Sequence, residues 1–265
     1  MKEFLVALQF LTRIPVKIKG NLSEKEIGQS AVFFPAVGVL QGLSAVCAAF
    51  FFSLMFSADI ASGLVIIILL ITNWGFHIDG LADTADAVSV KTTGDPMRDT
   101  EQRLSVMKDS TIGAIGVVAI ISVLLLKYLF VSGLLQKGLT WDVLYVLFLM
   151  PVFSKWIMVP IIYHGRSVRD TGLGNIFIRH VNSAVLVEST LLLAVIYFIT
   201  SCSLPEVTWR NITMLFFLFS VSLYILGLLW VAFCKKKFGG LTGDTIGAVS
   251  ELAEVLLPAI GFLWL

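Results

Sequence analysis

The sequence has 265 residues, of which 57% are hydrophobic and only 14% are charged, and its mean hydropathy is +0.92. A typical soluble domain is about 45–50% apolar and about 25% charged, so this composition excludes an ordinary soluble protein and indicates a chain that lies in the lipid bilayer. The net charge of +1 offers no strongly basic surface, and we expect no nucleic-acid partner.

The predicted elements begin with a short apolar helix over residues 1–11. Glu3 interrupts its start and no small-residue cleavage site follows, so we predict an interfacial or re-entrant helix that ends before Arg13 and Pro15, not a signal peptide. Seven longer apolar runs follow, each near the length of about 20 residues that a bilayer requires. They cover residues 31–56, 60–76, 112–135, 141–163, 183–200, 212–234 and 245–265. We therefore predict an all-α, polytopic helical bundle in which residues 1–265 form one integral membrane catalytic domain.

Lysine and arginine residues gather on one side of these seven spans. That side carries Lys2, Arg13, Lys17, Lys19, Lys25, Lys91, Arg98, Arg103, Lys108, Arg166, Arg169, Arg179, Lys235, Lys236 and Lys237. The other side carries only Lys137 and Arg210. Because cytoplasmic connections hold the excess of Lys and Arg in membrane proteins, we expect the inner membrane of a prokaryote, with the N-terminus in the cytoplasm and the C-terminus outside. Lys127 and Lys155 fall inside spans, where we expect their long side chains to snorkel to the interface.

The segment "HIDGLADTADA", residues 77–87, places three carboxylates directly after an apolar run. On a helix, Asp79, Asp83 and Asp86 have the spacing i, i+4, i+7 and share one stripe. Like charges at this spacing destabilise a helix unless a cation neutralises them, and oxygen ligands suit Mg²⁺ or Ca²⁺. We interpret Gly80 as room for a phosphate group beside the stripe. A solvated helix end is the alternative interpretation, weaker for three acids in phase than for one.

A second segment, "FGGLTGDTIGAVSELAE" at residues 238–254, combines a glycine-rich turn with the start of the last span. Backbone N–H groups point outward at such a turn, which suits a phosphate, although no Walker sequence is present. Either Thr242 or Asp244 is expected to cap the following helix. Glu251 and Glu254 lie further along it, roughly 9–14 Å from its start, where ionisable groups are costly and usually functional. The alternative is an interfacial helix that reaches Glu254 before a half-length apolar segment.

Two acidic helix starts on one side, with basic connections between them, predict a site for a diphosphate bridged by Mg²⁺. A carboxylate that does not bind the metal could accept the proton of an attacking hydroxyl group. The candidates for this catalytic role are Asp83, Asp86 and Glu251. The candidates for substrate binding are Arg13, Arg103, Lys108, Gly239, Gly240, Thr242 and Gly243. The connection with Arg166 and Arg169 has no clear pattern, and its role stays open.

Five segments together resemble the cobalamin synthase family, whose members are adenosylcobinamide-GDP ribazoletransferases. The segments are "FLTRIPV", "FFPAVGVLQG", "HIDGLADTADA", "MKDSTIGAIG" and "GGLTGDTIGAVSELAE", and they occur in the family's order over nearly the whole chain. The resemblance implies an integral membrane enzyme of the late vitamin B12 pathway that requires Mg²⁺. Its metal-ligand candidates, carried over by motif, are Asp79, Asp83, Asp86 and Asp244.

The same resemblance implies the substrates and the partners. Adenosylcobinamide-GDP would react with α-ribazole or its 5′-phosphate, giving adenosylcobalamin or its phosphate and releasing GMP. Other enzymes of the pathway and further copies of the chain are candidate protein partners.

Two other functions compete with this interpretation. A membrane phosphotransferase of the CDP-alcohol type also clusters aspartates at a membrane edge, but its pattern has an Ala-Arg pair shortly after Asp-Gly, whereas Leu-Ala-Asp follows here. A cation transporter would place acids near the middle of the membrane and on both sides. The acids of this chain instead gather on one side, beside the loops suited to phosphate.

Overall fold

The computed structural model describes residues 2–18, 20–202 and 209–265, so Lys19 of the expected positive side lies outside the described residues. The helices in chain order are α1 (Lys2–Leu11), α2 (Glu24–Gln29), the 3₁₀ helix η1 (Ser30–Phe33), α3 (Phe34–Ser53), α4 (Ala58–Thr72), α5 (Phe76–Ser89), α6 (Pro96–Val106), α7 (Ala114–Gln136), α8 (Trp141–Trp156), α9 (Met158–His164), α10 (Leu173–His180), α11 (Ser183–Ser201), α12 (Trp209–Phe238) and α13 (Gly243–Trp264). Across the described part of the chain, the only β-structure is an isolated bridge between Ser167 and Leu241. The expected all-α class is therefore confirmed.

Six helical segments are long and apolar enough to cross a membrane, which makes the chain a multi-pass membrane protein. They are Glu24–Ser53, Ala114–Gln136, Trp141–His164, Ser183–Ser201, Thr213–Phe238 and Gly243–Trp264. A seventh span exists only if α4 and α5 count as one, and these two helices meet at 89°. The predicted end of the span at residues 60–76 is thus wrong, because α4 stops at Thr72. The acidic segment forms a second helix, α5, that turns sharply away from α4.

The break between α4 and α5 has a local cause. Gly75 has φ +72°, in the left-handed region that favours glycine, and Trp74 also has a positive φ of +55°. The backbone N–H of Gly75 donates to the side-chain oxygen of Asn73 at 3.0 Å and to the carbonyl of Leu70 at 3.1 Å. These bonds end α4 as a helix C-terminus normally ends and let α5 start in a new direction.

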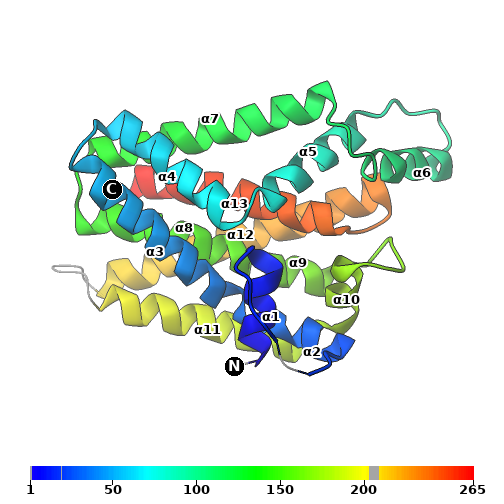
Figure 1. The fold of residues 1–265 in the computed structure, drawn as a ribbon, viewed down its shortest axis with the longest axis horizontal. Helices are drawn as coiled ribbons and strands as arrows, with labels where there is room; N and C mark the ends of the chain where they lie inside the picture. The colour runs from blue at the N-terminus through cyan, green and yellow to red at the C-terminus, as the bar shows by residue number, and fades with distance from the viewer. Residues whose placement is uncertain (1, 19, 203–208) are drawn as a thin grey trace.

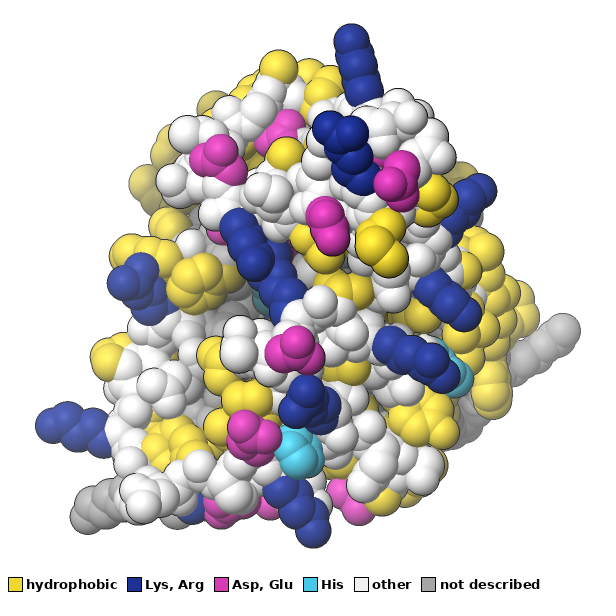
Figure 2. Space-filling view, turned by 90° about the vertical axis from the view of Figure 1, so that its right-hand side faces the viewer, with side chains coloured by type: hydrophobic (Ala, Val, Ile, Leu, Met, Phe, Trp, Pro, Cys, Tyr) yellow, Lys and Arg dark blue, Asp and Glu magenta, His cyan; other side chains and the backbone are white. Residues whose placement is uncertain are grey.

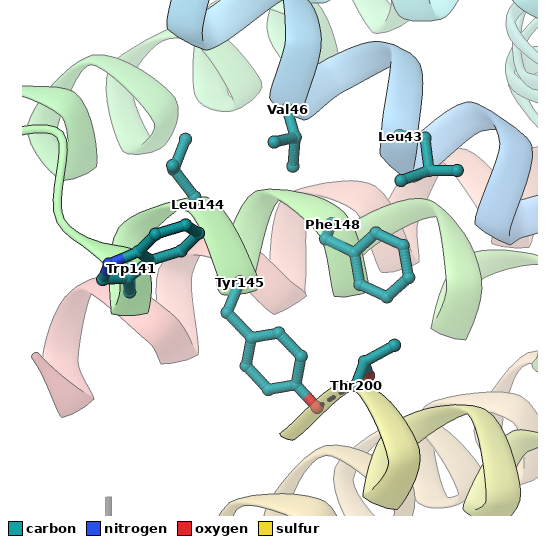
Figure 3. Close-up of a pocket in the computed structure, with 7 residues that line it drawn as sticks. All are labelled: Leu43, Val46, Trp141, Leu144, Tyr145, Phe148 and Thr200. Atoms are coloured by element: carbon teal, nitrogen blue, oxygen red, sulfur yellow. Dashed lines mark hydrogen bonds between the residues drawn. The ribbon is translucent and has the colours of Figure 1, made fainter. Parts of the chain in front are cut away.

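Helix α13 lies inside the bundle and packs against α5, α7, α8, α9 and α12 (Figure 1). Helix α8 is enclosed beyond its first turn, whereas α7, α11 and α12 expose large apolar side chains such as Leu125, Leu191 and Leu229. These outer faces suit contact with lipid, since no hydrophobic penalty applies there. One apolar groove on the bundle lies between α3, α8 and α11, where the hydroxyl groups of Tyr145 and Thr200 are hydrogen-bonded at 3.2 Å (Figure 3). It is lined by Leu43, Val46, Trp141, Leu144, Tyr145, Phe148 and Thr200, none of which is acidic or basic.

One end of the bundle, which we call the polar end, carries the C-terminal part of α5, helix α6 and the loops 165–172 and 239–243 (Figure 1). Figure 2 looks onto this end and shows Lys, Arg, Asp and Glu side chains interspersed over a hollowed face, with hydrophobic side chains at its margins. Helix α13 runs from this end to the opposite one, where the C-terminus lies (Figure 1). The polar end is therefore the part of the molecule to search for a site.

Candidate active site at the polar end

The two acidic segments of the sequence meet where α5 crosses the start of α13. A Cβ atom on Gly80 would lie 2.6 Å from the carbonyl oxygen of Asp244 and 2.9 Å from its Cα, so the two backbones touch there. Gly80 therefore makes room for α13 and not for a phosphate group, and our interpretation of it from the sequence is wrong. The physical reason is that only glycine permits this approach of two helices.

This crossing brings together three carboxylates, which we call the acidic site: Asp79 and Asp83 on α5, and Asp244 on α13. The negative charges of Asp79 and Asp244 both act on Asp83, and that of Asp86 acts on it more weakly. Asp79 is exposed, Asp83 is half-buried, and the side chain of Asp244 is 26% exposed. One oxygen of Asp244, Oδ2, is buried without a hydrogen-bond partner. Three like charges in such proximity favour a bound cation.

Asp86, predicted from the same stripe, has a different position. Its two oxygens accept hydrogen bonds of 2.7 Å from the backbone N–H groups of Gly113 and Gly116, at the first turn of α7. A Cβ atom on either glycine would collide with this carboxylate. Asp86 thus caps α7 from another helix, which satisfies N–H groups that a helix start leaves free. Both oxygens of Asp86 are thus already bonded to α7, although its charge still acts on Asp83, and this corrects its expected role as a metal ligand or base.

The predicted phosphate loop, residues 239–243, is held against the loop 165–172. The N–H of Leu241 donates to the carbonyl of Arg166 at 2.7 Å, and the N–H of Val168 donates to the carbonyl of Leu241 at 3.2 Å. Gly240 permits this contact, because a Cβ atom there would collide with the Arg166 carbonyl. Gly239 has φ +81° and faces solvent, and Gly243 is exposed with open space beside it.

Thr242, one of the two expected caps, is the residue that caps α13. Its hydroxyl oxygen accepts the N–H of Thr245 at 3.2 Å, and the Thr245 hydroxyl accepts the N–H of Thr242 at 2.9 Å. Thr242 is buried and forms part of the helix terminus, so it does not present its hydroxyl group to a substrate. Because Thr242 fills the capping position, the carboxylate of Asp244 is free to face α5.

The loop 165–172 contributes a residue that the sequence pattern left unassigned. Nη2 of Arg169 lies 3.3 Å from Oδ2 of Asp244, and the positive charge of Arg169 acts on Asp83 as well. The sequence offered only one signal for it, a basic loop on the side of the acids. The pairing of this loop with residues 239–243, which brings the arginine to the site, is a tertiary contact without a sequence pattern.

The three predicted basic side chains occupy different places. The guanidinium of Arg13 lies over the ring of Trp74, 4.9 Å from its centroid, beside the break between α4 and α5. Arg103 is buried and donates to the carbonyl of Lys237 at 3.1 Å, near the end of α12, so it supports the bundle and does not face the acidic site. Lys108 is exposed, next to Asp109. The Thr111 hydroxyl and N–H donate to Asp109 and lower the pKa of its carboxyl group.

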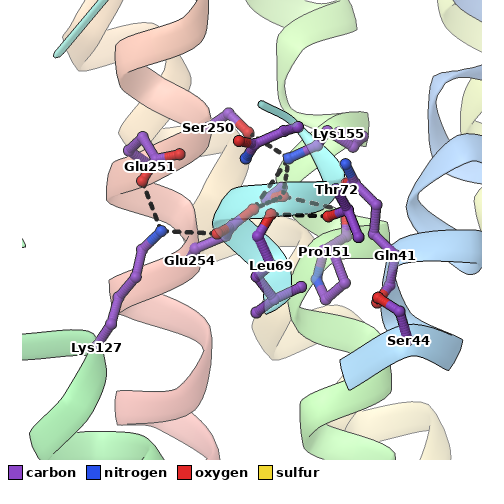
Figure 4. Close-up of polar contacts among 12 residues, drawn as sticks. Gln41, Ser44, Leu69, Thr72, Lys127, Pro151, Lys155, Ser250, Glu251 and Glu254 are labelled. Carbon is purple, nitrogen blue, oxygen red and sulfur yellow. Dashed lines mark hydrogen bonds and ion pairs between the residues drawn. The ribbon is translucent and has the colours of Figure 1, made fainter. Parts of the chain in front are cut away.

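Glu251 belongs to another polar region, which we call the buried ion cluster: Lys127 on α7, Lys155 on α8, and Glu251 and Glu254 on α13 (Figure 4). Nζ of Lys127 lies 2.6 Å from Glu251 and 2.7 Å from Glu254, and Nζ of Lys155 lies 2.9 Å from Glu254. All four side chains are at most 3% exposed. The two lysines therefore point inward to their partners and do not snorkel, contrary to our expectation.

Glu251 also lies seven residues beyond Asp244, which corresponds to roughly 10 Å along α13. The structure does not bring it to the acidic site, so its predicted catalytic role has no geometric support. A transporter would require deep acids that are free to bind a moving cation. Here the deep acids are matched one for one by buried lysines, which argues against a cation path.

The acidic site suits a metal that arrives with its substrate better than a resident one. Within the described ranges, no three His, Cys, Asp or Glu side chains are grouped tightly enough to hold a metal ion by themselves. Mg²⁺ usually binds through one or two carboxylates, with phosphate oxygens and water completing its octahedron. Two α5 aspartates opposite Asp244, with one buried oxygen unsatisfied, provide that kind of partial ligand set.

These features define a class: a polytopic membrane enzyme whose acidic site lies at one end of its helical bundle. Residues 3–262 match the family described as Cobalamin-5-phosphate synthase. The adenosylcobinamide-GDP ribazoletransferase of Thermodesulfovibrio yellowstonii is 38% identical over 97% of this chain and 94% of its own. Those of Clostridioides difficile and Geotalea daltonii are 33% and 32% identical, over 97% and 98% of this chain and 95% and 98% of theirs. No solved structure matches the chain.

The chain therefore belongs to the cobalamin-5-phosphate synthase family, and it is a transferase of cobalamin biosynthesis. The resemblance seen in the sequence is confirmed at the level of the family. The family match covers both acidic segments, which contribute the three carboxylates of the acidic site.

Proposed function

We propose that the chain joins adenosylcobinamide-GDP to α-ribazole or its 5′-phosphate, in a reaction that depends on Mg²⁺ and releases GMP. The observation that carries the proposal is the meeting of Asp79 and Asp83 with Asp244, at the end of the bundle that also holds a glycine-rich loop. The relatives named adenosylcobinamide-GDP ribazoletransferase support the choice of substrates.

The atoms of the transfer balance simply. A ribose hydroxyl oxygen of the acceptor bonds to the phosphorus on the cobinamide side, and the bond from that phosphorus to the bridging oxygen breaks. GMP leaves with the bridging oxygen and its electron pair, and the hydroxyl proton passes to a carboxylate. When bound, Mg²⁺ supplies positive charge that stabilises the diphosphate and its leaving group.

The residues of this chain then have distinct tasks. Asp79, Asp83 and Asp244 hold the cation, and an oxygen of this set that does not bind it accepts the hydroxyl proton. The backbone at Gly243, next to Asp244, and at Gly239 is exposed and open to phosphate oxygens. Lys108 and Arg13 are exposed and available to the outer parts of a large substrate.

We also propose that the polar end faces the cytoplasm of a prokaryote, across its inner membrane. The lysines and arginines at residues 91–108, 166–179 and 235–237 support this orientation. Because α13 runs away from the polar end, the C-terminus would then lie outside.

The test is an assay of the detergent-solubilised protein with adenosylcobinamide-GDP, α-ribazole and Mg²⁺, in which GMP and the corrinoid product are separated by chromatography. We expect equal amounts of both, and none when Mg²⁺ is removed by a chelator. Absence of GMP release, together with flux of Mg²⁺ or protons in proteoliposomes, would replace the transferase with a transporter.

A further inference from the structure

We infer that Arg169 exchanges partners during the reaction: it pairs with Asp244 in the free protein and with the diphosphate of the substrate once the cation is bound. This inference rests on the proposed function, and it adds a residue that no pattern in the sequence assigns to the site.

The loop 165–172 brings Arg169 next to Asp244. This loop is tied to the predicted phosphate loop through Leu241, as described above, and the hydroxyl of Ser167 donates to the carbonyl of Arg169 at 2.7 Å. The side chain is 28% exposed and emerges directly beside Asp244. The backbone of Arg169 is therefore held in place by contacts that do not involve the ion pair with Asp244.

The ion pair between Arg169 and Asp244 is weak. Nε and Nη2 of Arg169 and Oδ2 of Asp244 are buried, yet none of them has a hydrogen-bond partner in the described part of the chain. The 3.3 Å contact therefore lacks the geometry of the bidentate pairs that make arginine–carboxylate contacts strong. Such a pair exchanges easily for better partners.

Arg169 also changes the charge balance of the acidic site. Among the described residues, Arg169 provides a positive charge that acts on both Asp83 and Asp244. A cation bound to Asp244 would compete with Arg169 for Oδ2 and release the guanidinium. A planar guanidinium is suited to two oxygens of a phosphate group, which is the group that this cation would carry.

The exchange predicts opposite effects on two affinities when Arg169 is replaced by Gln. The affinity of the free protein for Mn²⁺, used as a probe for the metal and measured by electron paramagnetic resonance, should rise about two- to fivefold, because a competing charge is removed. The affinity for adenosylcobinamide-GDP at saturating Mg²⁺, measured by equilibrium dialysis, should fall on the order of 10- to 100-fold, because bonds to a charged group are lost.

Two further variants complete the experiment. Arg169→Lys keeps the charge and loses the planar fork, so Mn²⁺ affinity should stay near the wild-type value while the affinity for adenosylcobinamide-GDP still falls. Arg166→Gln is the matched control, since this exposed arginine lies in the same loop and keeps its backbone contact with Leu241; both affinities should stay unchanged.

Parallel loss of both affinities in Arg169→Gln would show that Arg169 only holds the loop in place, and no change in either would remove it from the site. Wild-type protein that turns over its substrate would in both cases leave the proposed function standing. Wild-type protein that neither binds Mn²⁺ nor releases GMP would overturn the proposed function and this inference with it.

Discussion

The chain contains two clusters of acidic side chains to which helix α13 contributes, and they differ in how their charge is balanced. In the buried ion cluster, two glutamates face two lysines, and the Ser154 and Ser250 hydroxyl groups also bond with this set (Figure 4). In the acidic site, three aspartates face one arginine that is poorly bonded. One cluster is neutral and enclosed, with Oε1 of Glu251 still lacking a hydrogen-bond partner among the described residues, and the other is negative and partly exposed.

Depth in the bundle does not by itself distinguish a functional acidic group from a structural one, whereas the balance of charge around the group does. Depth alone suggested that Glu251 is catalytic, but a buried charge with a matched partner already has a reason to be there. The aspartates are shallower, and among the described residues Arg169 offsets only part of their charge, so this site is suited to take up a further cation.

The largest effect is expected for Asp83→Asn, because the charges of both Asp79 and Asp244 act on Asp83. Removing its charge should lower turnover by at least about 10²-fold, the typical loss for a preorganised electrostatic group, and it should leave the unfolding of the protein unchanged. Turnover is measured by GMP release over a range of Mg²⁺ concentrations.

Asp142→Asn is the control for Asp83→Asn, since Asp142 is exposed in the first turn of α8, at the other end of the bundle. Its turnover should equal that of the wild type. Near wild-type activity of Asp83→Asn at saturating Mg²⁺ would mean that the imbalance of charge at the acidic site has no catalytic use.

The buried ion cluster should respond in the opposite way, through stability. Lys127→Met leaves Glu251 without its lysine and should cost about 3–5 kcal/mol of unfolding free energy, as expected for a buried charge that loses its partner. The double variant Lys127→Met/Glu251→Gln should recover part of this loss. Unfolding is followed by tryptophan fluorescence during titration with a denaturing detergent.

The single variant Glu251→Gln separates the two roles proposed for this side chain. It should change stability and leave the pH dependence of turnover as in the wild type. A shifted pH profile would return Glu251 to the catalytic set and would break the contrast between the two clusters.

An intermediate effect is expected where the acidic segments touch. Gly80→Ala places a methyl group against the backbone of Asp244, which cannot give way as a flexible side chain would, so α5 and α13 must separate. We expect a loss of about 1–3 kcal/mol in stability from overpacking, with a larger relative loss of turnover because the aspartates move apart.

Gly63→Ala on α4 is the matched control, because a Cβ atom there meets nothing within 4 Å. It should keep activity and gain up to about 1 kcal/mol from helix propensity. Unaltered turnover in Gly80→Ala would show that the close crossing is not needed for the site.

The sequence predicts the helices well because their apolar runs exceed the length of a span, and five of the seven predicted spans correspond closely to α3, α7, α11, α12 and α13. The span at residues 141–163 corresponds to α8 and α9 together. The break at residues 73–75 was missed because it depends on the left-handed conformation of Gly75 and on a hydrogen bond to Asn73, which hydropathy does not report.

The site was predicted in part for similar reasons. Helical spacing places Asp79 and Asp83 on one stripe, and the motif adds Asp244. Spacing cannot show that Lys127 reaches Glu251 from a helix 124 residues away, nor that Arg169 comes to Asp244 through a loop contact. Such pairings depend on which helices are neighbours, and a single sequence does not contain that information.

The smallest effect, and the sharpest test of the boundary of the acidic site, concerns Asp86. It shares the stripe of Asp79 and Asp83, but its two oxygens already accept the N–H groups of Gly113 and Gly116. Asp86→Asn keeps one acceptor and turns the other into a donor that faces an N–H group. We expect a loss of about 1–2 kcal/mol in stability, the usual cost of a lost helix cap, and less than about tenfold in turnover. The Mg²⁺ concentration that gives half-maximal turnover should not change, because no metal ligand is removed. A large rise in that concentration would place Asp86 among the metal ligands after all, and the carboxylate would then have to leave α7 when the cation binds.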